Sequence, residues 1–395
     1  MGLRTRRCVF RAIIALCSVA VLYGSGLRLR PAEAANDISP GELRQTKPGT
    51  IFRIWPLEGG VRLGYKGYRI LYRSVGLKDE PIAVSGAILF PADAGASSRP
   101  VVAWAHPTTG VVTRCAPTLM PNLSTSIQGL DFFADAGYVV VATDYTGLGA
   151  PGVHPYLVGQ NAARTLIDSV RAARTLSDAR ASNRFVVWGH SQGGHAALFT
   201  GQEVAGYAPE LKLLGVAAAA PATRLVELFD ADRDTSSGRS LTVMALYSWS
   251  RAFNFALSEY VVPHAEAAFG RLANDCIEDL RDFVTEDDDE RALDREFLKS
   301  NPTSDPRIRA IMEQNSAGML PAGMPVFLAQ GTADDLVRPD ITHAYAKQIC
   351  KAGAKVKMHA MSGVSHTWAA RDSAFAASQW MDALFKGRAP PTDCE

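Results

Sequence analysis

The stretch FVVWGHSQGGHAAL, residues 185–198, decides how the rest of the chain is interpreted. Its first four residues favour a β-strand, and its small-residue end favours a helix. Between them lies the pattern Gly-x-Ser-x-Gly, formed by Gly189, Ser191 and Gly193. A sharp strand-to-helix turn lifts a serine hydroxyl above a parallel sheet, where it can act as a nucleophile. An ordinary glycine-rich packing turn is the alternative, so the test is whether the chain also supplies a base and an acid.

Short apolar segments alternate with helical ones along most of the chain. Residues 68–74 and 82–90 predict an antiparallel pair of strands. Further strands are predicted at residues 100–105, 138–143, 185–188, 213–219, 325–329 and 356–360. Residues 161–177 predict a crossover helix, whose charged residues, among them Asp168, fall mostly off its apolar face. This pattern indicates an α/β fold, with a mostly parallel sheet that helices cover on both faces.

Residues 221–321 break this pattern. They contain no convincing strand, and helices are predicted at residues 241–261, 264–283 and 290–298. A helical insertion between late strands forms a cap, or lid, over the carboxyl ends of the strands, where α/β folds bind ligands. The expected core comprises residues 35–220 and 322–395.

Two features of this cap have alternative explanations. An apolar stripe at helical spacing fits either the interior of the cap or a groove for an acyl chain; it consists of Leu246, Trp249, Phe253 and Leu257. The acidic run at residues 286–290 fits a solvated loop better than a calcium loop, because it lacks a glycine and the alternation of ligands.

The N-terminus predicts a secretory signal at residues 1–34. A basic leader precedes an apolar run, and Ala32-Glu33-Ala34 forms an A-x-A cleavage site. A membrane anchor is the alternative, but the run is short, contains glycines and leads at once into the cleavage site. Residues 5–10 are similar to a twin-arginine signal, so both the Sec and the twin-arginine routes stay open. We expect a secreted or periplasmic protein cleaved near Ala34.

Charge and cysteine content narrow the functional class. Without residues 1–34, the chain has 35 basic and 39 acidic residues, which gives no reason to expect nucleic acid as a partner. Four cysteines remain: Cys115, Cys276, Cys350 and Cys394. An even set in an exported protein predicts disulfides, in any of three pairings. A zinc site is the competing interpretation, but no two of these cysteines have metal-ligand spacing, so no metal is expected.

A serine nucleophile needs a base, and in this kind of sheet the acid and then the histidine follow it in the chain. Three histidines precede Ser191, one lies a helical turn after it, and two lie in a predicted helix and a predicted strand; they are His106, His154, His190, His195, His343 and His359. His366 lies in a loop between the last strand and a helix, where a base belongs. The acid should follow the strand at residues 325–329; Asp334 is favoured there, and Asp335 is the alternative.

Two backbone N–H groups are expected to bind the oxyanion. One belongs to Gln192, which directly follows the serine. The other should come from the loop after residues 100–105. Pro107 has no N–H, so Thr108 is the predicted donor, through its backbone and also its hydroxyl. A loop that merely turns the chain is the alternative.

Six stretches together resemble the secretory lipase family of α/β-hydrolases. They are VVAWAHPTTGVVTRCAP (101–117), ATDYTGLGAPGVHPYL (142–157), WGHSQGGHAAL (188–198), GTADDLVRP (331–339), GVSHTWAA (363–370) and ASQWMDALFKGRAPPTDC (377–394). The resemblance spans about residues 50–394 and is weakest in the cap. Such sequences usually have His-Gly before the threonines, whereas this chain has His106-Pro107.

The resemblance implies a catalytic triad, a helical lid and two disulfides. The triad would be Ser191, Asp334 and His366, and the disulfides would join Cys115 to Cys276 and Cys350 to Cys394. We therefore expect a secreted serine lipase or esterase that needs no cofactor. Its substrate would be a small or lipid ester, and its cap would contact a lipid interface transiently. An acyltransferase or amidase with the same triad is the alternative, followed by a non-catalytic binding protein.

Overall fold

The computed structural model describes residues 31–57, 61, 64–93, 97–121, 123–277, 293 and 296–394. The signal predicted at residues 1–34 lies almost entirely outside this part of the chain, and the acidic run at 286–290 lies wholly outside it. Among the described residues, no helix is both long and apolar enough to cross a membrane.

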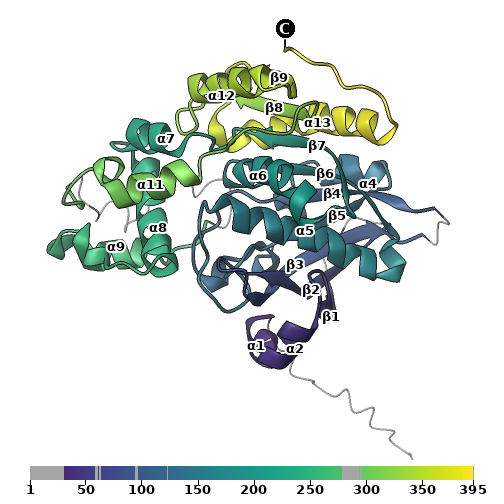
Figure 1. Ribbon diagram of the computed structural model, residues 1–395, viewed down its shortest axis with the longest axis horizontal. Coiled ribbons are helices and arrows are strands. Elements are labelled where there is room, and N and C mark those ends of the chain that lie inside the picture. The colour runs from purple at the N-terminus through teal and green to yellow at the C-terminus, as the bar shows by residue number, and fades with distance from the viewer. Residues whose placement is uncertain are drawn as a thin grey trace, which may run out of the picture.

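Nine strands within the described residues form one sheet (Figure 1), in the order β1-β2-β3-β5-β4-β6-β7-β8-β9. They are β1 (Ile51–Pro56), β2 (Tyr65–Val75), β3 (Pro81–Pro91), β4 (Arg99–Ala105), β5 (Val139–Thr143), β6 (Ala181–His190), β7 (Lys212–Ala219), β8 (Pro325–Gly331) and β9 (Lys355–Met361). The pairs from β1 to β5 are antiparallel, and the pairs from β5 to β9 are parallel. Every predicted strand is present, which confirms the α/β class.

The edge strand β1 is absent from the sequence prediction. It contains Arg53 and the exposed Ile54, so its apolar pattern is weak. Its partner β2 has a clear apolar pattern because helices cover it. An edge strand pairs on one side only and needs less apolar sequence, which explains the omission.

Helices cover both faces of the sheet. They are α1 (Pro31–Asn36), α2 (Pro40–Gln45), α3 (Leu123–Ser126), α4 (Leu130–Asp135), α5 (Gly159–Thr175), α6 (Gln192–Tyr207), α12 (Pro339–Lys351) and α13 (Ala369–Phe385). Successive residues of a strand point to opposite faces. In β4, Val101 therefore packs in the cluster under α5, α6 and α12, whereas Val102 packs in the cluster under α4 and α13.

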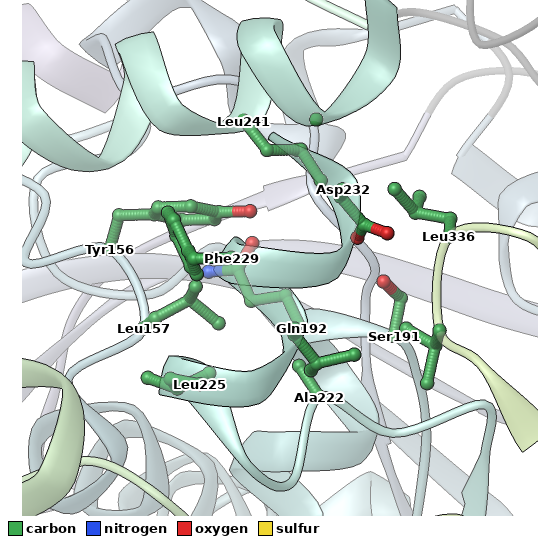
Figure 2. A pocket seen from close by; sticks show the side chains of 13 residues that line it. Tyr156, Leu157, Ser191, Gln192, Ala222, Leu225, Phe229, Asp232, Leu241 and Leu336 are labelled. Carbon is green, nitrogen blue, oxygen red and sulfur yellow. The ribbon is translucent and has the colours of Figure 1, made fainter. Parts of the chain in front are cut away.

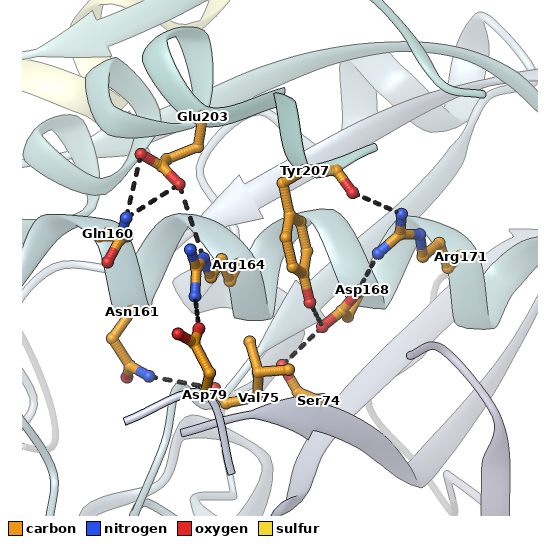
Figure 3. A network of polar contacts seen from close by, with 10 residues as sticks. All are labelled: Ser74, Val75, Asp79, Gln160, Asn161, Arg164, Asp168, Arg171, Glu203 and Tyr207. Atoms are coloured by element: carbon orange, nitrogen blue, oxygen red, sulfur yellow. Dashed lines mark hydrogen bonds and ion pairs between the residues drawn. The ribbon is translucent and has the colours of Figure 1, made fainter. Parts of the chain in front are cut away.

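The crossover helix α5 is fixed to the sheet by a buried carboxylate (Figure 3). Asp168 is fully buried, although it lies off the apolar face of the helix. Its Oδ2 accepts hydrogen bonds from Ser74 of β2 at 2.7 Å and from Tyr207 of α6 at 2.8 Å, and its Oδ1 lies 2.9 Å from Nη1 of Arg171. Burial raises the pKa of Asp168, and these three partners counter that effect. A charged residue outside the apolar stripe thus joins three elements of the core.

The insertion at residues 221–321 contains four helices among its described residues. They are α7 (Leu225–Asp232), α8 (Ser236–Ala252), α9 (Glu266–Leu272) and α11 (Pro306–Gln314), and they gather at one side of the sheet (Figure 1). The predicted boundaries are wrong in three places. The helix expected at 241–261 begins earlier, because Thr235 caps it by accepting from the N–H of Gly238, and it ends earlier, before Asn254 with its φ of 56°.

The other two cap helices also differ from the prediction. The helix expected at 264–283 ends at Leu272 in its described part. The described residues of the segment at 290–298 are not helical, and Leu298 instead forms an antiparallel bridge with Val261. The sequence did not suggest this bridge, since an isolated pair leaves no periodic pattern. None of the four stripe residues lines the pocket at Ser191. Leu246 and Trp249 are buried in the interior of the segment, whereas Phe253 is exposed and Leu257 is half-buried.

Two disulfides join distant parts of the chain, in the pairing that the family resemblance implies. Cys115, in the loop after β4, is bonded to Cys276, which follows α9. Cys350, in α12, is bonded to Cys394 near the end of the chain. The first disulfide therefore ties the insertion to the core.

Candidate active site

Ser191 occupies a strained turn between β6 and α6. Its φ is 55° and its ψ is −117°, a conformation that costs a non-glycine residue about 1–3 kcal/mol. The turn is closely packed: a Cβ at Gly193 would lie 1.9 Å from the carbonyl oxygen of Ala105, and one at Gly189 would lie 2.2 Å from that of Gly193. Both flanking glycines are therefore required for β4, β6 and α6 to meet here.

The structure brings Ser191, His366 and Asp334 together. Oγ of Ser191 lies 2.9 Å from Nε2 of His366, and Nδ1 of His366 lies 3.0 Å from Oδ2 of Asp334. Since an ionised carboxylate can only accept, Nδ1–H donates to Asp334 and Nε2 is left to accept the serine proton. All three residues are buried, with 4% to 8% of each exposed.

The loop after β8 holds Asp334 through its own backbone. Oδ1 accepts from the N–H groups of Leu336 and Val337 at 3.1 and 2.8 Å, and Oδ2 also accepts from Nε2 of Gln330 at 3.0 Å. The neighbouring Asp335 is exposed. The carboxylate at 334 is therefore the one directed at the histidine.

The other histidines make different contacts. His195 Nε2 lies 2.7 Å from the carbonyl oxygen of Asn315 and away from the serine, while His343 is in α12 and His359 in β9. Burial lowers the pKa of His359, and it lowers the pKa of four more deeply buried histidines to about 3 for His106 and His190 and to about 4 for His154 and His195. These four rings are neutral at neutral pH and serve as fixed hydrogen-bonding groups.

Of the two residues predicted to bind the oxyanion, Gln192 directly follows Ser191, and Thr108 follows the end of β4, which packs against Gly193. Gln192 is the first residue of α6, where backbone N–H groups have no partner within the helix. Its side-chain Nε2 donates to Nε2 of His154 at 3.1 Å, which fixes the side chain. The hydroxyl of Thr108 is 2.8 Å from that of Tyr156, and this contact fixes its side chain. Tyr156 lies in the stretch 142–157, but no pattern in that stretch indicates its contact with Thr108.

A pocket opens at Ser191 (Figure 2), and its walls are largely apolar. It is lined by Tyr156, Leu157, Ser191, Gln192, Ala222, Leu225, Leu228, Phe229, Asp232, Gly238, Leu241, Leu336 and Val337. Helices α7 and α8 of the insertion supply much of the wall opposite the serine. The free space is only about 40 Å³, room for one or two water molecules.

One polar residue of this pocket has no sequence signature. Asp232, the last residue of α7, is 6% exposed and points its carboxylate toward Ser191 (Figure 2). Burial raises the pKa of its carboxyl to about 7, and the negative charges of Asp334 and Asp335 add to the effect, while His366 and Arg338 oppose it. An aspartate at a helix end is usually solvated, so only the packing of the insertion marks this one as unusual. Across the described residues, no three His, Cys, Asp or Glu side chains come close enough together to hold a metal ion.

Comparisons with known proteins show the family and the fold of the chain. A profile of the family "Secretory lipase" matches residues 125–393. Lipase A of Arthroderma benhamiae is 24% identical over 83% of this chain and 72% of its own, and a probable inactive lipase of Mycobacterium tuberculosis is 22% identical over 93% and 85%. The structure of Candida antarctica lipase A in its closed state superposes with a TM-score of 0.76, at 16% identity over 91% of this chain and 88% of that one. The chain therefore belongs to the secretory lipase family of ester hydrolases and has the α/β-hydrolase fold.

Proposed function

We propose that the protein hydrolyses carboxylic esters through an acyl-enzyme on Ser191. As Oγ attacks the ester carbonyl carbon, Nε2 of His366 takes the hydroxyl proton and Asp334 stabilises the resulting imidazolium. The tetrahedral intermediate collapses, the bond to the alcohol oxygen breaks, and His366 gives the proton to that oxygen. Water then attacks the acyl-enzyme, again with His366 as base, and releases the acid and free Ser191. The observation that carries the proposal is the continuous chain of hydrogen bonds from Ser191 through His366 to Asp334 at a pocket.

The negative charge of the intermediate would be stabilised by the backbone N–H groups of Gln192 and Thr108. The start of α6 adds the positive end of a helix dipole at the same place. The Pro107 that precedes Thr108 limits the freedom of this loop, so the second donor is held before substrate binds.

Substrate entry would require the insertion to move. A pocket of about 40 Å³ is too small for even a short-chain ester, and α7 and α8 supply much of its wall. We assign residues 221–321 the role of a lid over the core of residues 35–220 and 322–395. Its opening would uncover apolar side chains such as Leu225, Phe229 and Leu241, and these would contact a lipid surface transiently.

Two features support the proposal that the protein is secreted. The two disulfides fit an oxidising compartment, as does membership of a secretory family. The export signal would be cleaved near Ala34, after transport by the Sec or the twin-arginine route.

Two tests separate ester hydrolysis from the alternatives. A fluorophosphonate probe should label the wild type and not Ser191→Ala; equal labelling of both, or none of the wild type, would indicate a non-catalytic protein. Rates on p-nitrophenyl esters and on anilides of the same acyl group should differ strongly in favour of the ester. An amidase would hydrolyse both, and an acyltransferase would be accelerated by added alcohol with release of a new ester.

The assignment of the acid has a matched control in the adjacent residue. Asp334→Asn should lower kcat by about 10⁴-fold, whereas Asp335→Asn should change it only a few fold. A larger loss of kcat in Asp335→Asn than in Asp334→Asn would show that Asp335, and not Asp334, is the acid. A series of esters of increasing chain length, tested below and above their solubility limits, would then tell a lipase with a moving lid from a simple esterase.

A further inference from the structure

Two buried polar atoms at the pocket beside Ser191 have no hydrogen-bond partner, which is unusual in a folded protein. Among the described residues, neither Oδ1 of Asp232 nor Oε1 of Gln192 has a hydrogen-bond partner, and both atoms are buried. The hydroxyls on the same walls are engaged, that of Tyr156 with Thr108 and that of Ser191 with His366. The two unpaired buried side-chain atoms of the pocket are therefore both oxygens, which accept hydrogen bonds when Asp232 is ionised. Because buried polar groups are normally paired, a molecule that enters should bring hydrogen-bond donors.

Asp232 is held in place by its own backbone. Its carbonyl oxygen accepts from the N–H and the hydroxyl of Thr235, at 2.9 and 2.8 Å. A Cβ at Gly238 would lie 2.0 Å from the same oxygen, so α8 begins directly against the end of α7. The carboxylate is thus attached to a closely packed turn whose backbone is fixed by hydrogen bonds. In Figure 2 it lies between Leu241 and Leu336, on the side of the pocket where Ser191 points.

The position of Asp232 relative to the histidine indicates which part of an ester it would meet. In Figure 2, Asp232 lies above Ser191 on the side of Leu336, whereas the side chain of Gln192 lies on the other side. Leu336 belongs to the loop whose Asp334 is hydrogen-bonded to His366. Asp232 therefore lies on the side of the serine where this loop holds the histidine. The histidine must reach the oxygen of the leaving alcohol to protonate it, so the alcohol part of the substrate occupies this side. Gln192, whose backbone is the predicted oxyanion donor, marks the side of the carbonyl oxygen.

We propose that Asp232 is a specificity-determining residue that accepts a hydrogen bond from the alcohol part of the substrate, so that the enzyme prefers esters whose alcohol carries a hydroxyl or a protonated amine near the ester oxygen. This inference rests on the proposed ester hydrolysis at Ser191 and adds the chemical class of the alcohol. Partial esters of a polyol have this chemistry, and so do esters of an amino alcohol. A donor in the pocket would satisfy Asp232 and favour its ionised form, against the burial that raises its pKa.

Matched esters of one acid test the proposal. Glycerol monobutyrate and propyl butyrate have the same acyl group and the same three-carbon alcohol skeleton, but only the first has donors. The wild type should hydrolyse glycerol monobutyrate with a kcat/KM about tenfold higher or more, as expected for a hydrogen bond to a charged group. Asp232→Leu should remove most of that ratio, and Asp232→Asn, which keeps a carbonyl acceptor, should remove only part of it. Asp234→Leu, on the exposed segment after α7, should keep the wild-type ratio.

Two further esters separate a hydrogen bond from simple charge attraction. Dimethylaminoethyl butyrate carries a protonated amine with one N–H, whereas choline butyrate carries the same charge and no donor. The proposal expects the first to be favoured over the second in the wild type and the difference to disappear in Asp232→Leu. Equal preference for both would overturn the hydrogen bond as the basis of selection.

The possible failures are distinguishable. If the wild type hydrolyses propyl butyrate and glycerol monobutyrate equally well, or if Asp232→Leu leaves their ratio unchanged, the inference about Asp232 is wrong and ester hydrolysis stands. If the wild type hydrolyses none of these esters, the proposed function is wrong and the inference fails with it.

Discussion

His190 and His366, 176 residues apart in the sequence, are joined by a hydrogen bond of 3.0 Å between Nε2 of His190 and the backbone carbonyl oxygen of His366. The carbonyl can only accept, so Nε2 of His190 carries the proton. Burial lowers the pKa of His190 to about 3, and its ring packs 4.9 Å from that of His366. The residue directly before Ser191 therefore holds the loop that carries the predicted base, and nucleophile and base are positioned by one turn.

We predict that His190 is a positioning residue. His190→Phe keeps a ring but removes the donor, and it should lower kcat about tenfold with little change in KM, because a loss of about 1 kcal/mol in loop position is felt mainly in the transition state. His190→Gln, which can still donate, should restore most of the loss.

The equally buried His195 is a matched control for this prediction. His195→Phe also removes a hydrogen bond, to the carbonyl oxygen of Asn315, but not one to the active-site loop. It should lower the melting temperature and leave kcat within a few fold. A fall in kcat of the same size in both variants would show that general destabilisation, and not position, is responsible.

The strained backbone at Ser191 predicts a trade-off between stability and activity. Ser191→Ala and Ser191→Gly both remove the nucleophile, yet only glycine adopts a φ of 55° with this ψ without strain. Ser191→Gly should therefore have a free energy of unfolding about 1–2 kcal/mol higher than Ser191→Ala. Denaturant unfolding measures the difference, and a glycine variant that is the less stable of the two would contradict the strain.

The two disulfides should differ in their effect on activity. Replacing either pair by alanine should lower the free energy of unfolding by about 2–5 kcal/mol. Only the Cys115–Cys276 bond lies near the predicted oxyanion loop, where the N–H of Ile277 donates to the carbonyl oxygen of Thr109 at 3.1 Å. Its loss should also lower kcat several fold. Loss of the Cys350–Cys394 bond, near the end of the chain, should leave kcat unchanged at temperatures where the protein is folded.

Asp232 should make stability fall as the pH rises. Its carboxyl pKa is about 7 in the folded protein and near the ordinary value of 3.8 when unfolded. Between these values the unfolded chain has released its proton while the folded protein retains it, so the free energy of unfolding decreases through this window and levels off above it. Asp232→Asn removes this dependence. Relative to that of the wild type, the free energy of unfolding of Asp232→Asn should therefore increase by about 1–2 kcal/mol between pH 5 and pH 8. This value is reduced to allow for screening by water in the pocket.

Asp230, two residues earlier in α7, is the control for this pH effect. Burial tends to raise its carboxyl pKa, but hydrogen bonds from Asn301 and Thr303 outweigh it and the pKa is lowered. Its contribution to stability is therefore present above the unfolded pKa and is lost on acidification. Asp230→Asn should accordingly show no gain between pH 5 and pH 8, and a gain equal to that of Asp232→Asn would contradict the assignment.

Much of the fold could be predicted because the buried strands are recognisable from their own runs of apolar residues. Strands buried on both faces, such as β4 and β5, are almost continuously apolar, and the Gly-x-Ser-x-Gly turn has strict steric requirements at Gly189 and Gly193. In residues 221–321 the apolar pattern predicted the limits of the helices less well. Helix α8 has different limits from those expected, because Thr235 caps its start and the left-handed Asn254 follows its end. In its described part α9 ends at Leu272, before the expected limit.

The sequence by itself determined which segments form the strands other than β1, the sharp turn at Ser191 and the three loops on which a serine, an acid and a histidine follow one another. These are local properties, set by side-chain polarity and by the steric freedom of glycine. Only the tertiary structure decided that Asp334 and not Asp335 faces His366, that Asp168 is buried between β2 and α6, and that Asp232 lies unpaired over Ser191. Burial and hydrogen bonding depend on which distant segments pack together, and no periodicity along the chain records that.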